Sequence, residues 1–523
     1  MKLTPAGKGF LAVVLIAVVG FVLWYRFQVQ RGQPAAVPVA LSAPAPAAVA
    51  PVTPPPPPVA ATAKPSRPQN RIVVGVNDFG GAYPGIVAND GATAGPRSRF
   101  KAAGLDVEVK LIRGSKERLD AFDTGDVDVM LLTLDYLANL VPVYKDKGVD
   151  LKSFLLVDWS RGNLGIVAKP GFKTIESLAK AKVATTRNTP THYFLLSMLG
   201  RSNLNAGQVE AAKGNIVFAT KTPLAGEMFK RGDVDAVAIW EPHLSQCMAE
   251  GKGQLLVSTA TATNLVADVL FARTDWLKAH DAELVAFTRA WFEGVAALER
   301  DPAGSVATIA AAFKQTPEET QGVLSKIKPA TFADNRAVLG LEREQAPYLT
   351  LFDDASRFWQ REGVVKAPAD AAATRYLKPL EALAKEHADE KVVEKFQFSA
   401  GPRKDAAALL TKSVSIYFAS GADKLDPNAK KLVDGFAQML AEFGNAFVRV
   451  EGNTDATGAR AANVALSKRR AAALVSYLVA QHGFPEARFQ AVGNGPDKPV
   501  GDNQTEEGRD MNRRTDFQII PNN

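Results

Sequence analysis

The sequence predicts an α/β protein built of two lobes, followed by a smaller α+β domain and preceded by a transmembrane helix and a Pro/Ala-rich linker. Three observations lead to this prediction: an uncharged apolar run near the N-terminus, a central region where β-rich runs alternate with helical patterns, and a compact final unit with two amphipathic helices. A chain of 523 residues is also too long for a single hydrophobic core.

The N-terminal segment reads as a membrane anchor. Residues 9–25, GFLAVVLIAVVGFVLWY, carry no charge, and Lys8 and Arg26 flank them. A run of this length is about the shortest helix that spans a hydrocarbon core. It ends in bulky residues rather than in a small-x-small cleavage site, which favours an uncleaved signal anchor over a cleaved signal peptide. We therefore expect residues 1–31 to hold a transmembrane helix.

Residues 32–69 are predicted to be a linker. They are rich in proline and alanine, include the run Pro54 to Pro58, and contain almost no charge. Such a composition cannot bury a core and favours extended polyproline II structure. The linker would therefore act as a semi-stiff spacer.

Residues 70–395 are predicted to form the two lobes. Short β-rich runs such as Ile72 to Val76 alternate with helical patterns, which indicates parallel α/β sheets. Two segments, LDAFDTGDVDVMLLT and EMFKRGDVDAVAIWEPH, each lead from a helix end through Gly-Asp-Val-Asp into a buried strand. This repetition predicts two similar lobes, and the chain becomes mainly helical after about Asp275.

These two segments, together with LGIVAKPGFKTIESLAKAKVATTRNTPTHYFL, carry a family resemblance over about Arg71 to Leu377. The region resembles the type 2 periplasmic solute-binding proteins, specifically the nitrate/taurine-type substrate-binding proteins of ABC transporters. The resemblance implies two lobes, joined by crossing strands, that close over a small ligand.

Folds of this kind bind ligands at the carboxyl ends of strands, where loops and helix N-termini meet. That rule selects Asp78, Phe79, Gly80, Gly81, Tyr83, Thr133, Asp135, Trp159, Asn163, Asn188, Thr189, Thr191, His192, Trp240 and Glu241. The helix start at Thr189 favours an anion, and we expect phosphate, nitrate or a sulfonate. The acids Asp78, Asp135 and Glu241, beside aromatic residues, would instead suit an amine or a pyrimidine.

The chain shows no recognisable catalytic motif. It lacks the G-x-S-x-G, H-E-x-x-H and P-loop patterns, and its histidines are widely separated. The single cysteine, Cys247, excludes an intrachain disulfide or a Cys-based metal cluster and is expected in the core. We therefore expect no enzyme activity, cofactor or metal. The chain has a net charge of +7, but its basic residues form no dense run with aromatic residues between them. No nucleic-acid partner is therefore expected.

Residues 406–523 are predicted to form the α+β domain. Strands are expected at SVSIYF, AFVRVEG, RFQAVG and RTDFQII, with helices at PNAKKLVDGFAQMLAEF and ALSKRRAAALVSYLVAQHG. Asp426 and Pro427 are suited to the N-cap and first position of the earlier helix. Its predicted apolar stripe is Leu432, Phe436, Leu440 and Phe443.

Several separated motifs in this domain occur in a characteristic order: SIYFASGADKL, VEGNTDATG, LSKRRA and NQTEEGRDMNRR. From about Val414 to Ile520 the chain is similar to the OmpA-like peptidoglycan-binding domain. One departure is Asn453, where that family often has histidine.

In that family the domain binds the diaminopimelate of peptidoglycan stem peptides, and the resemblance places the two principal ligand residues at Asp455 and Arg470. A carboxylate accepts hydrogen bonds from the ligand's ammonium, and a guanidinium binds its carboxylate bidentately. Thr454, Asn463 and Arg514 are expected around them. The alternative is a structural Asp455–Arg470 ion pair.

Peptidoglycan lies outside the inner membrane, so we expect a single-pass inner-membrane protein with most of its chain in the periplasm. The expected function is to bind a small solute in the interlobe cleft and to attach non-covalently to peptidoglycan, with an ABC permease or a sensor protein as a further partner. The alternatives are a wall-tethered scaffold or sensor, in which the two lobes form a protein-interaction module, and an unrecognised enzyme.

Overall fold

The computed structural model describes residues 67–250, 253–341, 346–394, 396–398, 407–418 and 421–522. The expected transmembrane helix at residues 9–25 and the linker up to residue 66 lie outside the described residues. Of the helices in the described part, none combines the length and the apolar character needed to cross a membrane.

The first lobe is built on a six-stranded sheet with the order β11-β4-β10-β3-β1-β2. Its strands are β1 (Arg71–Val76), β2 (Asp106–Leu111), β3 (Val129–Thr133), β4 (Leu151–Ser160), β10 (Ala267–Arg273) and β11 (Ile327–Pro329). β1 pairs in parallel with β2 and β3, whereas β10 and β4 run antiparallel to their neighbours. The prediction of parallel sheets is therefore confirmed only in part, because β10, which returns from the other lobe, runs opposite to its neighbours β3 and β4.

The second lobe holds a five-stranded sheet with the order β7-β6-β8-β5-β9. Its strands are β5 (Leu164–Ala168), β6 (Val183–Thr186), β7 (Ile216–Ala219), β8 (Ala236–Trp240) and β9 (Gln254–Ser258). The helices here are α6 (Pro190–Arg201), α7 (Ala206–Gly214), α8 (Thr222–Arg231) and α9 (His243–Ala249). Cys247 on α9 is fully buried, which confirms its prediction as a core residue.

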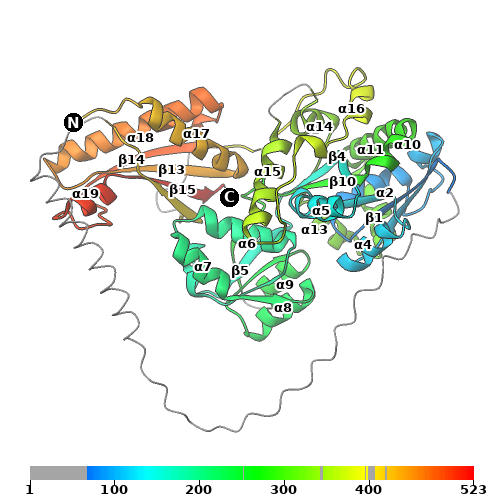
Figure 1. Cartoon of the computed structure of the whole chain (residues 1–523), viewed down its shortest axis with the longest axis horizontal. Helices are drawn as coiled ribbons and strands as arrows, with labels where there is room; N and C mark the ends of the chain where they lie inside the picture. The colour runs from blue at the N-terminus through cyan, green and yellow to red at the C-terminus, as the bar shows by residue number, and fades with distance from the viewer. Residues whose placement is uncertain are drawn as a thin grey trace, which may run out of the picture. The chain divides into compact units, whose positions relative to one another are not determined.

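The chain passes from the first sheet to the second between β4 and β5 and returns between β9 and β10. Around the first sheet, α2 (Tyr83–Asn89) contacts α11 (Asp281–Arg300), and α5 (Leu134–Asp146) contacts α15 (Pro347–Arg361) (Figure 1). α4 (Ser115–Asp123) contacts β1. The expected change to helical structure after Asp275 is confirmed, since mostly helices follow β10. This is the two-lobed periplasmic-binding-protein fold with mixed sheets.

The remaining helices of this region are short or peripheral to the cleft. They are α3 (Arg99–Ala102), α10 (Thr274–Ala279), α12 (Pro302–Phe313), α13 (Pro317–Leu324), α14 (Phe332–Leu339) and α16 (Lys378–Leu383). The core they cover includes the fully buried rings of Trp291, Trp359 and Tyr348. Burial of aromatic side chains of this size contributes strongly to the stability of the lobe.

The C-terminal domain has a four-stranded sheet with the order β12-β15-β13-β14, and its helices α17 and α18 contact one another (Figure 1). Its elements are β12 (Leu410–Val414), α17 (Pro427–Glu442), β13 (Ala446–Asn453), α18 (Arg460–His482), β14 (Phe489–Gly495), α19 (Glu506–Asn512) and β15 (Thr515–Pro521). The predicted strand SVSIYF, residues 413–418, is displaced along the chain, because β12 begins at Leu410 and ends at Val414, and residues 415–418 belong to no strand.

Helix α17 begins as predicted, since the Asp426 carboxylate accepts a hydrogen bond from the Ala429 amide at 2.7 Å. The predicted apolar stripe contains one error. Leu432 is 47% exposed, whereas its neighbour Val433 is fully buried. The buried positions 429, 433, 436, 437 and 440 follow the helical period, so the stripe is displaced by one residue at this turn.

Candidate functional site

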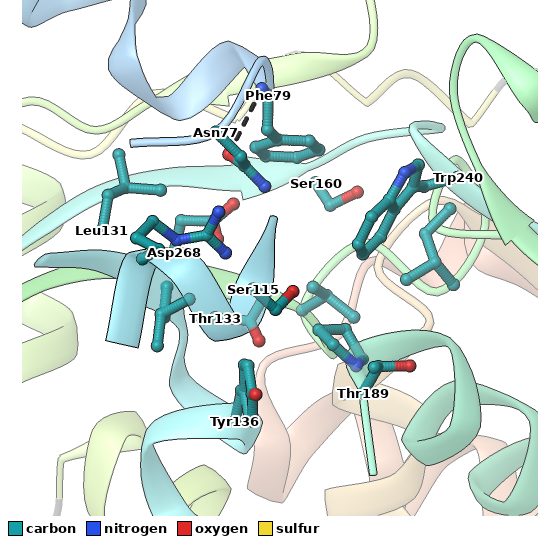
Figure 2. Close-up of a pocket in the computed structure, with 15 residues that line it drawn as sticks. Asn77, Phe79, Ser115, Leu131, Thr133, Tyr136, Ser160, Thr189, Trp240 and Asp268 are labelled. Atoms are coloured by element: carbon teal, nitrogen blue, oxygen red, sulfur yellow. Dashed lines mark hydrogen bonds between the residues drawn. The ribbon is translucent and has the colours of Figure 1, made fainter. Parts of the chain in front are cut away.

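A cavity lies between the two lobes, where the carboxyl ends of β1, β3 and β8 meet the N-terminus of α6. It is lined by Asn77, Phe79, Ser115, Arg118, Leu131, Leu132, Thr133, Tyr136, Ser160, Leu164, Thr189, Pro190, Trp240, Val266 and Asp268. Figure 2 shows side chains from both lobes around a common space. Open α/β sheets bind ligands at this kind of position.

Four of the residues selected from the sequence line this cavity: Phe79, Thr133, Thr189 and Trp240. The loop after β1 is turned by Asn77, whose Oδ1 accepts a hydrogen bond from the Phe79 amide at 3.3 Å (Figure 2). The Thr133 hydroxyl is buried beside the Asp135 carboxyl. Phe79 and Trp240 supply aromatic surface from opposite lobes, so a ligand here would meet both apolar faces and polar groups.

Two predicted acids have partners of their own. Asp78 is exposed, and its carboxylate pairs with Arg113 at 3.1 Å. The Glu241 carboxylate forms an ion pair with Lys326, which belongs to the first lobe, and accepts a hydrogen bond from the Ser245 hydroxyl at 2.8 Å. Glu241 therefore links the lobes instead of lining the cavity.

Three residues predicted from the first loop lie beneath the cavity. Gly80 and Gly81 form a buried 3-10 turn with little room for a side chain, because a Cβ at Gly81 would lie 3.3 Å from Asp158 Oδ2. Tyr83 is fully buried, and its hydroxyl donates to Gln315 Oε1 at 3.1 Å. Burial raises the pKa of Tyr83. The loop is thus packed against the core rather than open to a ligand.

The predicted residues around the start of α6 mostly bond to one another. The Asn188 amide donates to His192 Nδ1 at 3.3 Å, and the Thr185 hydroxyl donates to Thr191 Oγ1 at 2.9 Å. Burial lowers the pKa of His192 to about 4, and its ring contacts the edge of Phe218. These side chains hold the helix start in place, whereas Thr189 and Pro190 reach the cavity.

Trp159 and Asn163, from the first crossing, are buried but do not line the cavity. Asn163 Nδ2 donates to the Lys326 carbonyl at 3.2 Å, while its Oδ1 has no partner. Asp135 is the second residue of α5 and is 4% exposed, with only the Thr133 hydroxyl close enough to lower its pKa as a donor from another side chain. Burial raises the pKa of Asp135 to about 7.

Sequence reasoning missed the two charged side chains that line the cavity, Arg118 and Asp268. Each is 2% exposed. Arg118 lies on α4, and its Nη1 donates to the Ile112 carbonyl at 2.8 Å, but its Nε has no partner. Asp268 lies on β10, where its Oδ2 has no partner. A charged residue within the apolar run LVADVLFA was the available signal for Asp268.

Asp268 has a second acid beside it. Asp158 on β4 is its partner in the β4–β10 register, and the two carboxyls are close enough to hydrogen-bond to one another. Burial raises the pKa of both carboxyls, and for Asp158 the neighbouring negative charge adds to the effect. Two carboxyls held this closely favour sharing one proton.

A second site lies in the C-terminal domain, where all five residues predicted for peptidoglycan line one pocket. Its lining residues are Ile416, Tyr417, Phe418, Gly421, Gly452, Asn453, Thr454, Asp455, Thr457, Asn463, Leu466, Ser467, Arg470, Glu506, Arg509, Arg513, Arg514 and Thr515. They come from the end of β13, the first turns of α18, the region around α19 and the segment after β12. The pocket is thus assembled from motifs far apart in the sequence.

Asp455 pairs with a residue that the sequence did not single out. Its Oδ2 lies 2.7 Å from Arg513 Nη1, and its Oδ1 accepts from the Thr457 amide at 2.9 Å. Burial alone would raise the pKa of Asp455, but these hydrogen bonds hold it below its ordinary value. Asp455 is therefore ionised and oriented at neutral pH.

Arg470 extends from α18 toward the segment after β12. Its Nε donates to the Ala422 carbonyl at 2.9 Å, and its guanidinium lies 4.8 Å from the ring centroid of Phe418. Burial lowers the pKa of Arg470, which still leaves an arginine charged at neutral pH. The alternative interpretation, a structural Asp455–Arg470 ion pair, is not found among the described residues, where Asp455 pairs with Arg513.

The other predicted residues shape the pocket. Asn463 Nδ2 donates to the Thr457 carbonyl at 2.9 Å, and the Thr454 hydroxyl donates to the Asp455 carbonyl at 2.8 Å. Arg514 forms a buried ion pair with Asp516 at 3.0 Å. These contacts fix the loop that presents Asp455.

Family models match two regions of the chain. Residues 66–313 match the NMT1-like family, and residues 417–513 match the OmpA family. The two-lobed region is therefore similar to the NMT1-like family, and the C-terminal domain is similar to the OmpA family.

Curated relatives match about a fifth of the chain. Outer membrane protein Omp38 of Acinetobacter baumannii is 36% identical over 105 residues, which cover 20% of this chain and 30% of that protein. The peptidoglycan-associated lipoprotein of Pseudomonas putida is 37% identical over 110 residues, which cover 21% of this chain and 65% of that protein. The chain thus spans about a third of Omp38 and just under two thirds of the lipoprotein.

Two solved structures are similar at low sequence identity. The periplasmic aliphatic sulphonate-binding protein SsuA of Escherichia coli is 16% identical with a TM-score of 0.47, covering 64% of this chain and 98% of that one. The alkanesulfonate-binding protein SsuA of Xanthomonas axonopodis pv. citri, bound to MOPS, is 16% identical with a TM-score of 0.45, covering 60% and 100%.

Proposed function

We propose that the C-terminal domain binds the diaminopimelate of peptidoglycan stem peptides through Asp455 and Arg470. The observation that supports this proposal is that both side chains line one pocket, with an ionised acid at one place and a guanidinium at another. The free end of diaminopimelate carries an ammonium and a carboxylate on one carbon. Asp455 accepts hydrogen bonds from the ammonium, and Arg470 donates to the carboxylate.

The test is sedimentation of the full chain with purified peptidoglycan. Arg470→Ala and Asp455→Asn should each weaken binding by about 30-fold or more, because losing one partner of a desolvated charge pair costs about 2–5 kcal/mol. Arg460→Ala is the matched control, since Arg460 lies on the same helix and pairs with Asp497 outside the pocket. Undiminished binding by both folded site variants would contradict the proposal.

We also propose that the cavity between the lobes binds a small solute without chemical conversion. Its position at the strand ends, its two aromatic walls and its unpartnered polar groups support this role. The proposed ligand is a small anion such as phosphate, nitrate or a sulfonate, because the helix start at Thr189 favours negative charge. The positive charge of Arg118 in the cavity lining also favours an anion.

The solute proposal is tested by native mass spectrometry of the purified chain. A discrete added mass, lost on denaturation, is the expected result and identifies the ligand. Thermal-shift titration with phosphate, nitrate and methanesulfonate then tests the anion class. A chain that neither carries a ligand nor responds to any solute would favour the alternative, a wall-tethered scaffold or sensor whose lobes bind another protein.

We further propose that residues 9–25 anchor the chain in the inner membrane, with both domains in the periplasm and an ABC permease or a sensor as partner. The apolar run and a peptidoglycan-binding C-terminus support this topology. Protease added to spheroplasts should digest the domains of the membrane-bound chain. Protection of the domains, or release of the chain into the soluble fraction, would contradict it.

A further inference from the structure

The lining of the cavity between the lobes holds one positive and one negative side chain. These are Arg118 and Asp268, and no ion pair joins them in the described part of the chain. Behind Asp268 lies Asp158, its neighbour across the β4–β10 ladder, and Asp135 is close enough for Asp268 to raise its pKa. Three buried acids thus gather around one end of the cavity.

The chain supplies few donors to these acids. The shared proton joins Asp158 to Asp268, and the Thr133 hydroxyl lies beside Asp135, but Oδ2 of Asp268 has no partner. Among positive groups, Arg161 acts on Asp158 but forms its own ion pair with Glu394 at 3.1 Å. Buried carboxyl oxygens in proteins are almost always hydrogen-bonded or paired, so Asp268 Oδ2 can accept one further donor.

Of the three acids, only Asp268 reaches the cavity lining. It lies 2% exposed beside Ser160 and Val266, at the point where the crossing segments enter the first sheet. A simple inorganic anion bound here would add negative charge next to this carboxylate. A cationic group would donate a hydrogen bond to this carboxylate and would also neutralise its charge.

We propose that the solute carries a protonated nitrogen, as an amine or an amidinium, that donates to Asp268. This inference rests on the proposed solute-binding function and departs from its ligand class. It replaces phosphate and nitrate by a solute with a cationic group, and any acidic group on the same solute would face Arg118. The nitrogen of the solute lies at Asp268, and its carbon skeleton contacts Phe79 and Trp240. An acceptor atom elsewhere on the solute accepts a hydrogen bond from Arg118 Nε, which has no partner within the described residues. Asp158 retains the shared proton and lies behind the contact.

The test uses the full chain and a bacterial small-molecule extract separated on a strong cation exchanger at pH 3. The retained fraction holds compounds with a protonated nitrogen, and the flow-through holds simple anions. The retained fraction should raise the melting temperature of the two-lobed domain. A response to the flow-through alone overturns this proposal but keeps solute binding, and a response to neither overturns both.

A variant then locates the contact. Asp268→Asn keeps the shape of the side chain and removes its charge, and it should weaken binding of the active compound by at least about tenfold. Asp120→Asn is the matched control, because Asp120 lies on α4 beside Arg118 but is exposed and pairs with Lys116. Equal binding by wild type and a folded Asp268→Asn variant would contradict the proposal, and the fraction test stands even if that variant does not fold.

Discussion

The two sites of this chain hold their acids in opposite ways. In the C-terminal domain Asp455 has a guanidinium and an amide as partners, and its pKa is lowered. Behind the cleft, Asp135 is buried and forms no ion pair among the described residues, and burial raises its pKa to about 7. The acid of the C-terminal pocket is therefore held ionised by its partners, whereas burial favours the neutral form of the acid behind the cleft.

The largest expected effect that would sharpen this contrast is a pH dependence of the two-lobed domain. The folded pKa of Asp135 is about 7, against about 3.9 for an unfolded aspartate. Its stabilising contribution is therefore full below pH 4 and is lost as the pH rises to about 7. Asp135→Asn should become more stable relative to wild type by roughly 1–4 kcal/mol between pH 4 and pH 7.5.

This effect can be measured by urea unfolding followed through tryptophan fluorescence. Five of the six tryptophans lie between residues 159 and 359, and the C-terminal domain has none, so the change in signal on unfolding reports the two-lobed domain. Trp24 lies outside the described residues and is common to wild type and variant. A stability difference that does not change with pH would show that Asp135 has a further donor in solution, and the contrast between the two sites would fail.

A smaller effect is expected at the ion pair between the lobes. Lys326→Met removes the partner of Glu241, whose side chain is only 5% exposed. The closed arrangement should lose about 1 kcal/mol, which is about a fivefold loss of apparent solute affinity. Small-angle scattering should show a larger radius of gyration for the ligand-free variant. Lys116→Met, which breaks an exposed pair on α4, should change neither quantity.

The smallest effect is expected at the pocket of the C-terminal domain. Arg513→Ala removes the main partner of Asp455, so the pKa of Asp455 should rise toward its ordinary value. The lowered pKa contributes stability above the unfolded pKa that is lost as the pH falls through the folded value. Because the pair is partly exposed, the loss should stay under about 1 kcal/mol.

NMR titration of the Asp455 carboxyl carbon would measure this shift directly. If the pKa stays low in Arg513→Ala, then the amide of Thr457 or Arg470 orients the acid, and the pocket depends less on Arg513 than the geometry indicates.

The residues proposed to bind peptidoglycan could be brought to one pocket from sequence because their motif is short. Asp455 follows β13, and Arg470 lies on the next helix, so both line the same pocket. Arg513 was missed as the partner of Asp455 because it directly follows α19, which only the folded domain brings near.

The cleft was predicted less well for a physical reason. The rule of strand ends identified Phe79, Thr133 and Trp240, but it also selected Asp78, whose side chain turns to Arg113. Arg118 and Asp268 lie inside a helix and a strand, where periodicity gives no hint of a binding role. Likewise, Leu432 and Val433 are adjacent apolar residues, and only the helix rotation decides which is buried.

The crossing strands β4 and β10 place part of the cavity lining next to the connections between the two lobes. Ser160 ends the first crossing strand, and Asp268 begins the second, so both cavity groups lie next to the segments about which the lobes would rotate. When the lobes rotate, distances between atoms near the rotation axis change little, whereas the far edges of the lobes move much further. Binding of a molecule at these two groups would therefore couple a sub-ångström change in the cavity to a larger displacement at the outer surface.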